Sequence, residues 1–179
     1  MKHKIALVLV LVLACAFTAA AAQDIEIQKE NELFYMAVTL PSGARVENSI
    51  TDDNFSLTVI GFLTPGKPTV EITVAADELY AERNLSGLPQ EDVDRIISGI
   101  IVEMANPKTE IRVSQSGYAY IVANEQEDAN DTSDTVMLVN GYFVMVKVYY
   151  PDFSTLTQAD EEIGPAIVET FRFVGNTNS

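Results

Sequence analysis

The segment over residues 135–150 constrains the fold more than any other part of this chain. Two apolar runs, at 135–139 and 142–150, flank the dipeptide Asn140-Gly141. An Asn-Gly pair between two such runs is the strongest short-range signal for a β-hairpin, because both turn residues must accept a positive φ angle. Both alternating faces of the runs are apolar. We therefore expect a hairpin inside a sheet that is covered on both sides.

Five further segments have the composition or alternation of strands: 33–40, 55–63, 69–75, 110–114 and 118–123. A Pro-Gly turn between 55–63 and 69–75 predicts a second hairpin. The polar segment 23–31 is expected to be an irregular lead-in.

Two segments have the periodicity of helices. In 89–104, apolar residues recur at the 3.6-residue spacing of one buried stripe. In 156–171, Thr157 and Asp160 resemble a capping box, and Pro165 predicts a kink. The simplest assembly is an α+β fold, with a mainly antiparallel sheet covered by helices on both faces as an α-β-α sandwich.

The N-terminus has the pattern of an export signal. A positively charged start precedes an apolar run over 5–17, and Ala20 and Ala22 fit the small-residue pattern of a signal-peptidase site. We expect 1–22 to be a signal peptide and 23–179 to form one exported domain that is extracellular, periplasmic or at the cell surface. The alternatives are a leader retained as a membrane anchor, or a lipid attached at Cys15.

Charge and residue identity exclude several functions. The chain carries 26 acidic and 11 basic residues, a net charge of −15, without a basic cluster. Nucleic acids and anionic membrane surfaces would repel such a protein. Its only histidine and cysteine, His3 and Cys15, lie in the expected leader. Without them the domain has no Ser-His-Asp triad, thiolate nucleophile or structural zinc site.

Carboxylate chemistry survives these exclusions. The segment 124–134 concentrates acidic residues, and Asp128, Asp131 and Asp134 are candidate calcium ligands. Ser133 stands where an EF-hand loop requires glycine, so the site would be weak and of another type. A pair of carboxylates could also hydrolyse glycosides, although no spacing singles out a pair. Lys147 interrupts an apolar strand, where we expect it to extend toward the sheet edge rather than act as a base.

The chain resembles the PsbP-like superfamily, which includes the photosystem II extrinsic subunit PsbP and the nuclear Mog proteins. The resemblance rests on Leu-Pro-Ser-Gly at 40–43, Met-Leu-Val-Asn-Gly-Tyr-Phe at 137–143 and Glu-Thr-Phe-Arg-Phe at 169–173. It implies an α-β-α sandwich that binds or assists other proteins, and it supplies no catalytic residues.

These observations favour an exported, non-enzymatic binding or assembly-assisting domain, whose partner is an unknown protein or small molecule. No cofactor is expected, apart from the calcium already considered. The alternatives are a carboxylate-based hydrolase acting on glycosides and a weak calcium-binding protein.

Overall fold

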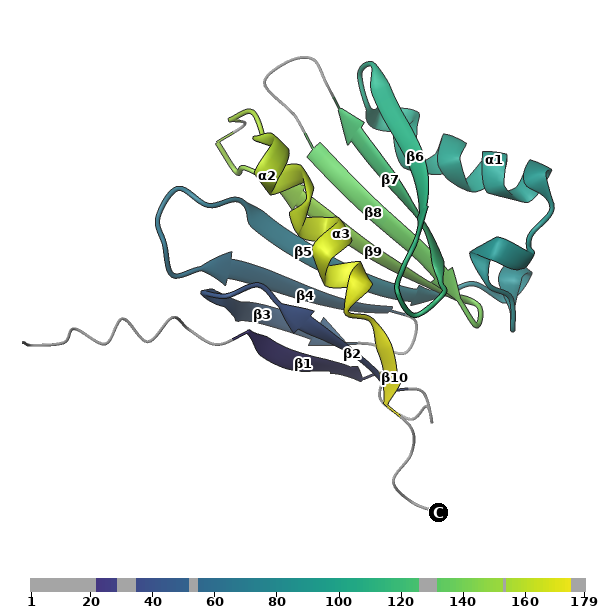
Figure 1. Cartoon of the computed structure of the whole chain (residues 1–179), viewed down its shortest axis with the longest axis horizontal. Coiled ribbons are helices and arrows are strands. Elements are labelled where there is room, and N and C mark those ends of the chain that lie inside the picture. Colours follow the sequence, from purple (N-terminus) through teal and green to yellow (C-terminus); the bar gives the residue numbers. More distant parts are fainter. Residues whose placement is uncertain (1–21, 29–34, 52–54, 126–131, 153, 175–179) are drawn as a thin grey trace, which may run out of the picture.

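The fold is built on a long antiparallel sheet and a short one (Figure 1). The computed structural model describes residues 22–28, 35–51, 55–125, 132–152 and 154–174. The expected leader, apart from Ala22, lies outside these residues. The long sheet has the strand order β3 (Ala44–Thr51), β4 (Phe55–Phe62), β5 (Thr69–Ala76), β9 (Tyr142–Tyr149), β8 (Thr132–Val139), β7 (Ala119–Glu125) and β6 (Pro107–Val113). The short sheet has the order β1 (Gln23–Gln28), β2 (Tyr35–Leu40) and β10 (Arg172–Val174).

The hairpin predicted at Asn140-Gly141 is confirmed as β8–β9, with φ angles of 48° and 81° at its two turn residues. The Pro-Gly turn joins β4 to β5, as predicted. The segment expected to be an irregular lead-in instead forms β1, which pairs with β2. In this segment polar residues alternate with isoleucines, a pattern that fits a strand at the edge of a small sheet.

One face of the long sheet carries the main core. It is covered by α2 (Gln158–Glu161), α3 (Ile163–Glu169) and strand β2. The predicted capping box is present, because the side chains of Thr157 and Asp160 each accept a hydrogen bond from the other residue's backbone N–H. The predicted kinked helix is two helices, and Pro165 lies in the first turn of the second, where its missing N–H costs little.

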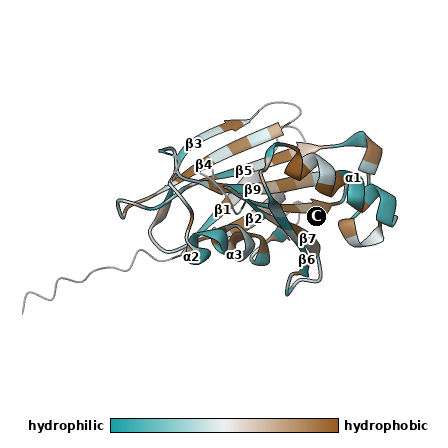
Figure 2. Ribbon diagram, turned by 90° about the horizontal axis from the view of Figure 1, so that it is seen from above, coloured by the Kyte–Doolittle hydropathy of each residue, from teal (hydrophilic) through white to brown (hydrophobic). Residues whose placement is uncertain are grey.

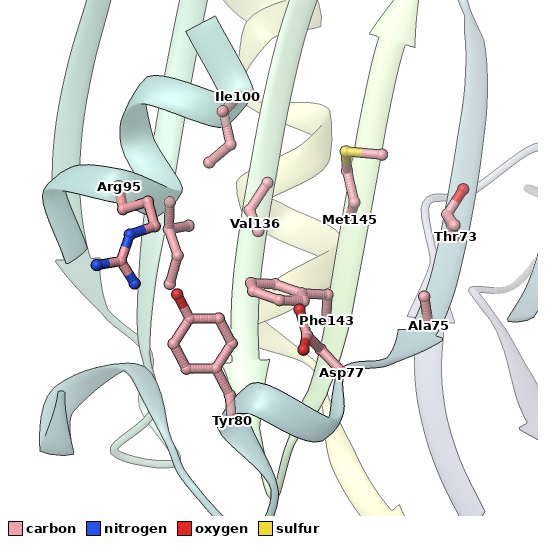
Figure 3. A pocket seen from close by; sticks show the side chains of 11 residues that line it. Thr73, Ala75, Asp77, Tyr80, Arg95, Ile100, Val136, Phe143 and Met145 are labelled. Carbon is pink, nitrogen blue, oxygen red and sulfur yellow. The ribbon is translucent and has the colours of Figure 1, made fainter. Parts of the chain in front are cut away.

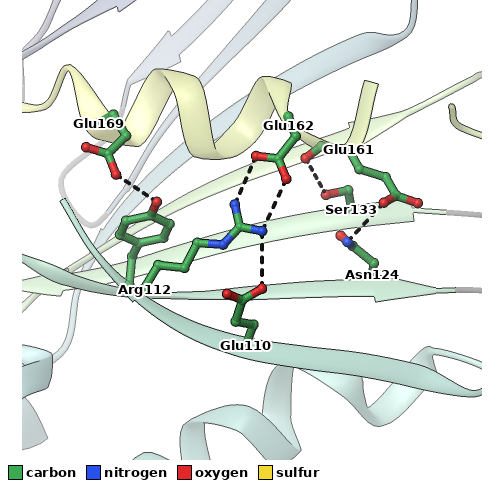
Figure 4. Close-up of polar contacts among 8 residues, drawn as sticks. Glu110, Arg112, Asn124, Ser133, Glu161, Glu162 and Glu169 are labelled. Carbon is green, nitrogen blue, oxygen red and sulfur yellow. Dashed lines mark hydrogen bonds and ion pairs between the residues drawn. The ribbon is translucent and has the colours of Figure 1, made fainter. Parts of the chain in front are cut away.

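Polar contacts also attach α2 and α3 to the strands (Figure 4). The Arg112 guanidinium of β6 donates to both carboxylate oxygens of Glu162, at 2.9 and 3.1 Å. The Tyr120 hydroxyl of β7 donates to Glu169 at 2.8 Å. Burial, followed by this carboxylate, raises the pKa of Tyr120 to about 12.

The other face of the long sheet is only partly covered. A single helix, α1 (Gln90–Ile100), packs there with Val93 and Ile96 over residues of β7 and β8. In Figure 2, α1 lies well apart from the α2–α3 pair. The α1-side residues of β5 and β9 are half-buried rather than buried, so these strands show an alternating burial pattern.

The prediction of an α-β-α sandwich is therefore wrong. The structure is mostly sheet, and a second sheet shares the covered face with α2 and α3. One helix about 10 Å wide covers about two strands spaced about 4.8 Å apart, so α1 cannot cover seven. Burial on both faces was expected for the whole hairpin and holds for β8, whereas β9 is buried on one face.

Candidate functional site

The half-covered face presents two rows of side chains that run across the central strands. Strand pairing places Thr73 of β5 beside Met145 of β9, and Met145 beside Val136 of β8. The adjacent row consists of Glu71, Lys147 and Asp134 from the same three strands. An apolar row and a charged row therefore lie side by side beneath α1.

The apolar row forms the floor of a cavity of about 390 Å³ (Figure 3). We call it the apolar compartment; its walls include Tyr80, Ile96, Ile100, Val136, Phe143 and Met145. Tyr80 belongs to the 3-10 turn η1 (Glu78–Tyr80), and its ring meets Phe143 edge to face with centroids 5.7 Å apart. Figure 3 shows Ile100 on one side of this space and Thr73 and Ala75 on the other.

Two members of the charged row, Lys147 and Asp134, border a second cavity of about 410 Å³, the acidic compartment. It is lined by Glu103, Glu125, Asp134 and Lys147, together with Thr132 and Met104 among others. Both compartments include Gly99 and Ile100 in their walls, so they meet beneath the end of α1. We call the two compartments together the α1 groove; it runs along β9 from Phe143 to Lys147.

Asp134 is the most unusual group in the groove. Its side chain is buried, with a relative exposure of 7% for the residue, and its Oδ1 atom has no hydrogen-bond partner among the described residues. Burial raises the pKa of Asp134 to about 6; the charge of Lys147 opposes this rise, whereas Glu125 and Glu71 add to it. A buried acceptor without a donor is rare in folded proteins and calls for an explanation.

Lys147 lies between two carboxylates and forms a close ion pair with neither of them among the described residues. It occupies a central strand rather than a sheet edge, and its cross-strand neighbours are Glu71 and Asp134. None of the ion pairs found among the described residues includes it. Glu71 instead accepts a hydrogen bond of 2.7 Å from the Tyr149 hydroxyl. This bond, followed by burial, raises the pKa of Tyr149 to about 12.

Glu125 connects the end of the helix to the sheet. Its Oε1 atom accepts a hydrogen bond of 2.7 Å from the backbone N–H of Ala105, just beyond the 3-10 turn η3 (Ile101–Glu103) that follows α1. Glu125 is itself buried, with 8% exposure. The contact connects the segment after α1 to β7 and so fixes this wall of the acidic compartment.

The candidate calcium ligands predicted from the sequence are only partly placed. Asp128 and Asp131 lie outside the described residues, so their role as ligands stays a prediction. Asp134 belongs to β8 rather than to a loop, and it lies beneath α1. In the part of the chain that the structure describes, no cluster of three His, Cys, Asp or Glu side chains could hold a metal ion.

Sequence reasoning missed Glu71 and the groove itself, and it counted Glu125 only among the acidic residues of the segment 124–134. The one available signal was Lys147, a charge on the apolar face of a strand. Its neighbours could not be inferred, because Glu71 and Lys147 are brought together by the long-range pairing of β5 with β9.

Within the described residues, none of the helices has the length and apolar character required to cross a membrane. No family model matches the chain, and no curated protein matches it either. The resemblance to the PsbP-like superfamily thus stays a prediction from sequence motifs, and the sandwich that it implied is not the fold observed.

Proposed function

We propose that this protein is an exported, non-enzymatic binding domain and that the α1 groove is its ligand-binding site. The observation that carries the proposal is the buried carboxyl group of Asp134, which lines the acidic compartment and whose Oδ1 atom has no hydrogen-bond partner among the described residues. Buried polar groups are almost always paired in folded proteins, so a ligand donor that reaches this carboxyl group from the acidic compartment would offset its burial.

The size and make-up of the groove support binding. Each compartment lies within the range of about 300–1,000 Å³ that is usual for ligand pockets. Apolar walls next to a few convergent polar groups are the usual arrangement in such pockets. The walls are held by the Tyr80–Phe143 ring contact and by the hydrogen bond from Ala105 to Glu125. A preformed site spares a ligand the cost of ordering it.

The methionines provide a direct test. Met145 lines the apolar compartment and Met104 lines the acidic one, whereas Met36 and Met137 are buried in the core with 1% and 0% exposure. In a protein labelled with ¹³C at its methionine methyl groups, small neutral probes such as indole and benzyl alcohol should shift the Met145 signal saturably. The Met36 and Met137 signals should stay in place. No saturable shift of Met145 up to roughly 10 mM of any probe would overturn the proposal.

A matched pair of variants localises the binding. Thr73→Phe places a ring in the apolar compartment and should abolish the shift of Met145. Leu57→Phe adds a ring on the neighbouring strand, where residue 57 is the cross-strand partner of Thr73 outside the groove. This control should bind like the unmodified protein.

A carboxylate-based hydrolase is the second candidate. The pKa of Asp134, raised to about 6, is in the range of a glycosidase general acid, and the carboxyl groups of Glu125 and Glu71 lie near it. No aromatic side chain is present among the described residues that line the acidic compartment, although sugars usually stack on one, so binding is the better-supported function. Turnover of chromogenic glycosides between about pH 4 and 7, lost in Asp134→Asn, would favour the hydrolase.

A further inference from the structure

We propose that the ligand of the α1 groove is an amphipathic amine, with its ammonium group bound by Asp134 in the acidic compartment and its apolar group in the apolar compartment. This inference rests on the proposed function and adds the chemical class of the ligand. Its geometric basis is the junction of the two compartments at Gly99 and Ile100.

The charge balance of the acidic compartment selects a cation. Three carboxylates, those of Glu103, Glu125 and Asp134, line it against the single ammonium of Lys147, and Glu71 lies next to that lysine. A ligand carboxylate or phosphate could pair with Lys147 only by approaching these acidic groups, at a cost in repulsion. A ligand ammonium instead offers donors and an opposite charge to the carboxyl group of Asp134, which lines the compartment and takes part in none of the ion pairs found among the described residues.

The end of α1 adds to this preference. Gly99 and Ile100, at the C-terminal end of the helix, form part of the compartment wall. The last carbonyl groups of a helix carry partial negative charge, which cationic side chains often offset. The last turn of α1 contains no basic residue. A bound ammonium would therefore receive a favourable field from the helix as well as from Asp134.

The spacing of the two compartments limits the length of the ligand. Met145 marks the floor of the apolar compartment, and Lys147, two residues further along β9, marks the acidic one. Two residues of a strand span about 7 Å. A ring separated from an ammonium by about three carbon atoms covers this distance, which makes 3-phenylpropylamine a suitable probe.

Three probes that share one apolar group test the inference. They are 3-phenylpropylamine, the uncharged 3-phenylpropan-1-ol and the anionic 3-phenylpropanoate. Titration at neutral pH should show the amine shifting both Met104 and Met145 and binding about tenfold or more tighter than the alcohol, because a charge-assisted hydrogen bond replaces a neutral one. The carboxylate should bind most weakly.

Two variants assign the preference to Asp134. Asp134→Asn should reduce the advantage of the amine over the alcohol to about twofold or less, because a neutral amide no longer provides the charge that strengthens the hydrogen bond from the ammonium. Glu91→Gln removes an exposed carboxylate from the first turn of α1, outside the groove, and should keep the full preference. Unshifted Met36 and Met137 signals verify that each variant retains its core.

The outcomes separate the two proposals. Equal binding of amine and alcohol by the unmodified protein would overturn the ammonium inference and leave the proposed binding site standing. A preference for the amine that survives in Asp134→Asn would overturn the assignment to Asp134, because general attraction to an acidic surface would then account for it. Failure of all three probes to move Met145 would count against the binding function itself.

Discussion

At the scale of single residues, Asp134 is a carboxyl group whose ionisation the fold opposes. It sits on β8, the most buried strand of the hairpin, between Lys147 on β9 and the Glu125 end of β7. A neighbouring lysine would ordinarily lower the pKa of a carboxyl group, but here burial has the larger effect and the pKa rises. The residue therefore weakens the folded state at neutral pH, which is consistent with a role in binding.

This shift predicts a pH dependence of stability. The pKa of Asp134 rises from 3.8 to about 6 on folding, so between these values the unfolded chain loses the proton first. Stability attributable to this group therefore falls as pH rises from about 4 to 6, by about 3 kcal/mol in total. Asp134→Asn should remove that decrease. Urea unfolding at several pH values should show the variant gaining stability relative to the unmodified protein across this interval.

Other charged groups also face Asp134, so the pH dependence of each variant must be compared with that of the unmodified protein. Lys147, Glu71 and Glu125 act on its charge, and Glu103 lines the same compartment. Thr132→Ala, which alters the same compartment without an ionisable group, should show a difference independent of pH. A constant difference for Asp134→Asn as well would contradict the raised pKa.

At the scale of elements, the β8–β9 hairpin depends on a docking contact as well as on its turn. The backbone N–H of Gly141 donates to the carbonyl of Arg83 at 2.9 Å, and its carbonyl accepts from the N–H of Asp77 at 2.9 Å. The N–H of Asn140 donates to the side chain of Asn84 at 2.8 Å. The hairpin tip thus holds the segment that carries Tyr80 into the groove.

Gly141 is required at this tip for two reasons. Its φ angle is 81°, and a Cβ atom added there would lie 2.9 Å from the Cα atom of Ala81. Gly66 has a similar φ angle of 75° with nothing within 4 Å of such an atom. Gly66→Ala should therefore cost roughly 1 kcal/mol of unfolding free energy from backbone strain alone. Gly141→Ala should cost at least roughly 1 kcal/mol more, because the chain must also move apart. If thermal or urea unfolding shows equal losses of unfolding free energy for the two variants, the hairpin tip can move away from Ala81 without an energetic penalty.

At the scale of the whole molecule, the charge is far from balanced. The net charge is −15, so the excess acidic groups repel one another in the compact folded state. Ion pairs such as Arg112 with Glu162 offset only part of this repulsion. The same field would attract a cationic ligand toward the groove before any contact forms. Charge therefore influences both the stability of the fold and its proposed partner.

This imbalance predicts that salt stabilises the protein. Raising sodium chloride from about 0.02 to 0.3 M at pH 7 should increase the urea concentration at the unfolding midpoint, because the added ions screen the repulsion. The isoelectric point of the sequence is about 4.2. Near that pH the net charge is small, so the effect of salt should largely disappear. A midpoint that falls with salt at pH 7 would mean that attractive ion pairs outweigh the repulsion.

Local chemistry determined several elements of this protein before any tertiary contact was considered. Asn140-Gly141 predicted the central hairpin because few residues accept positive φ angles, and Thr157 with Asp160 predicted the start of α2 because the capping box is made within four residues. Apolar periodicity likewise located α1, although the structure ends it at Ile100. These features depend on neighbours in sequence.

Tertiary structure alone decided which faces were covered and what the groove contains. The apolar residues on both faces of the hairpin suggested two helical layers, yet a second sheet supplies part of one layer and α1 covers only a strip of the other. From the sequence, Asp134 was expected to lie in a loop, but it is a buried residue of β8 that pairs with Ala123 of β7 and Lys147 of β9. The long-range pairing of β5 with β9 then brings Glu71 beside Lys147. Burial and long-range strand pairing depend on contacts between segments that are far apart in the sequence, and no local sequence pattern encodes those contacts.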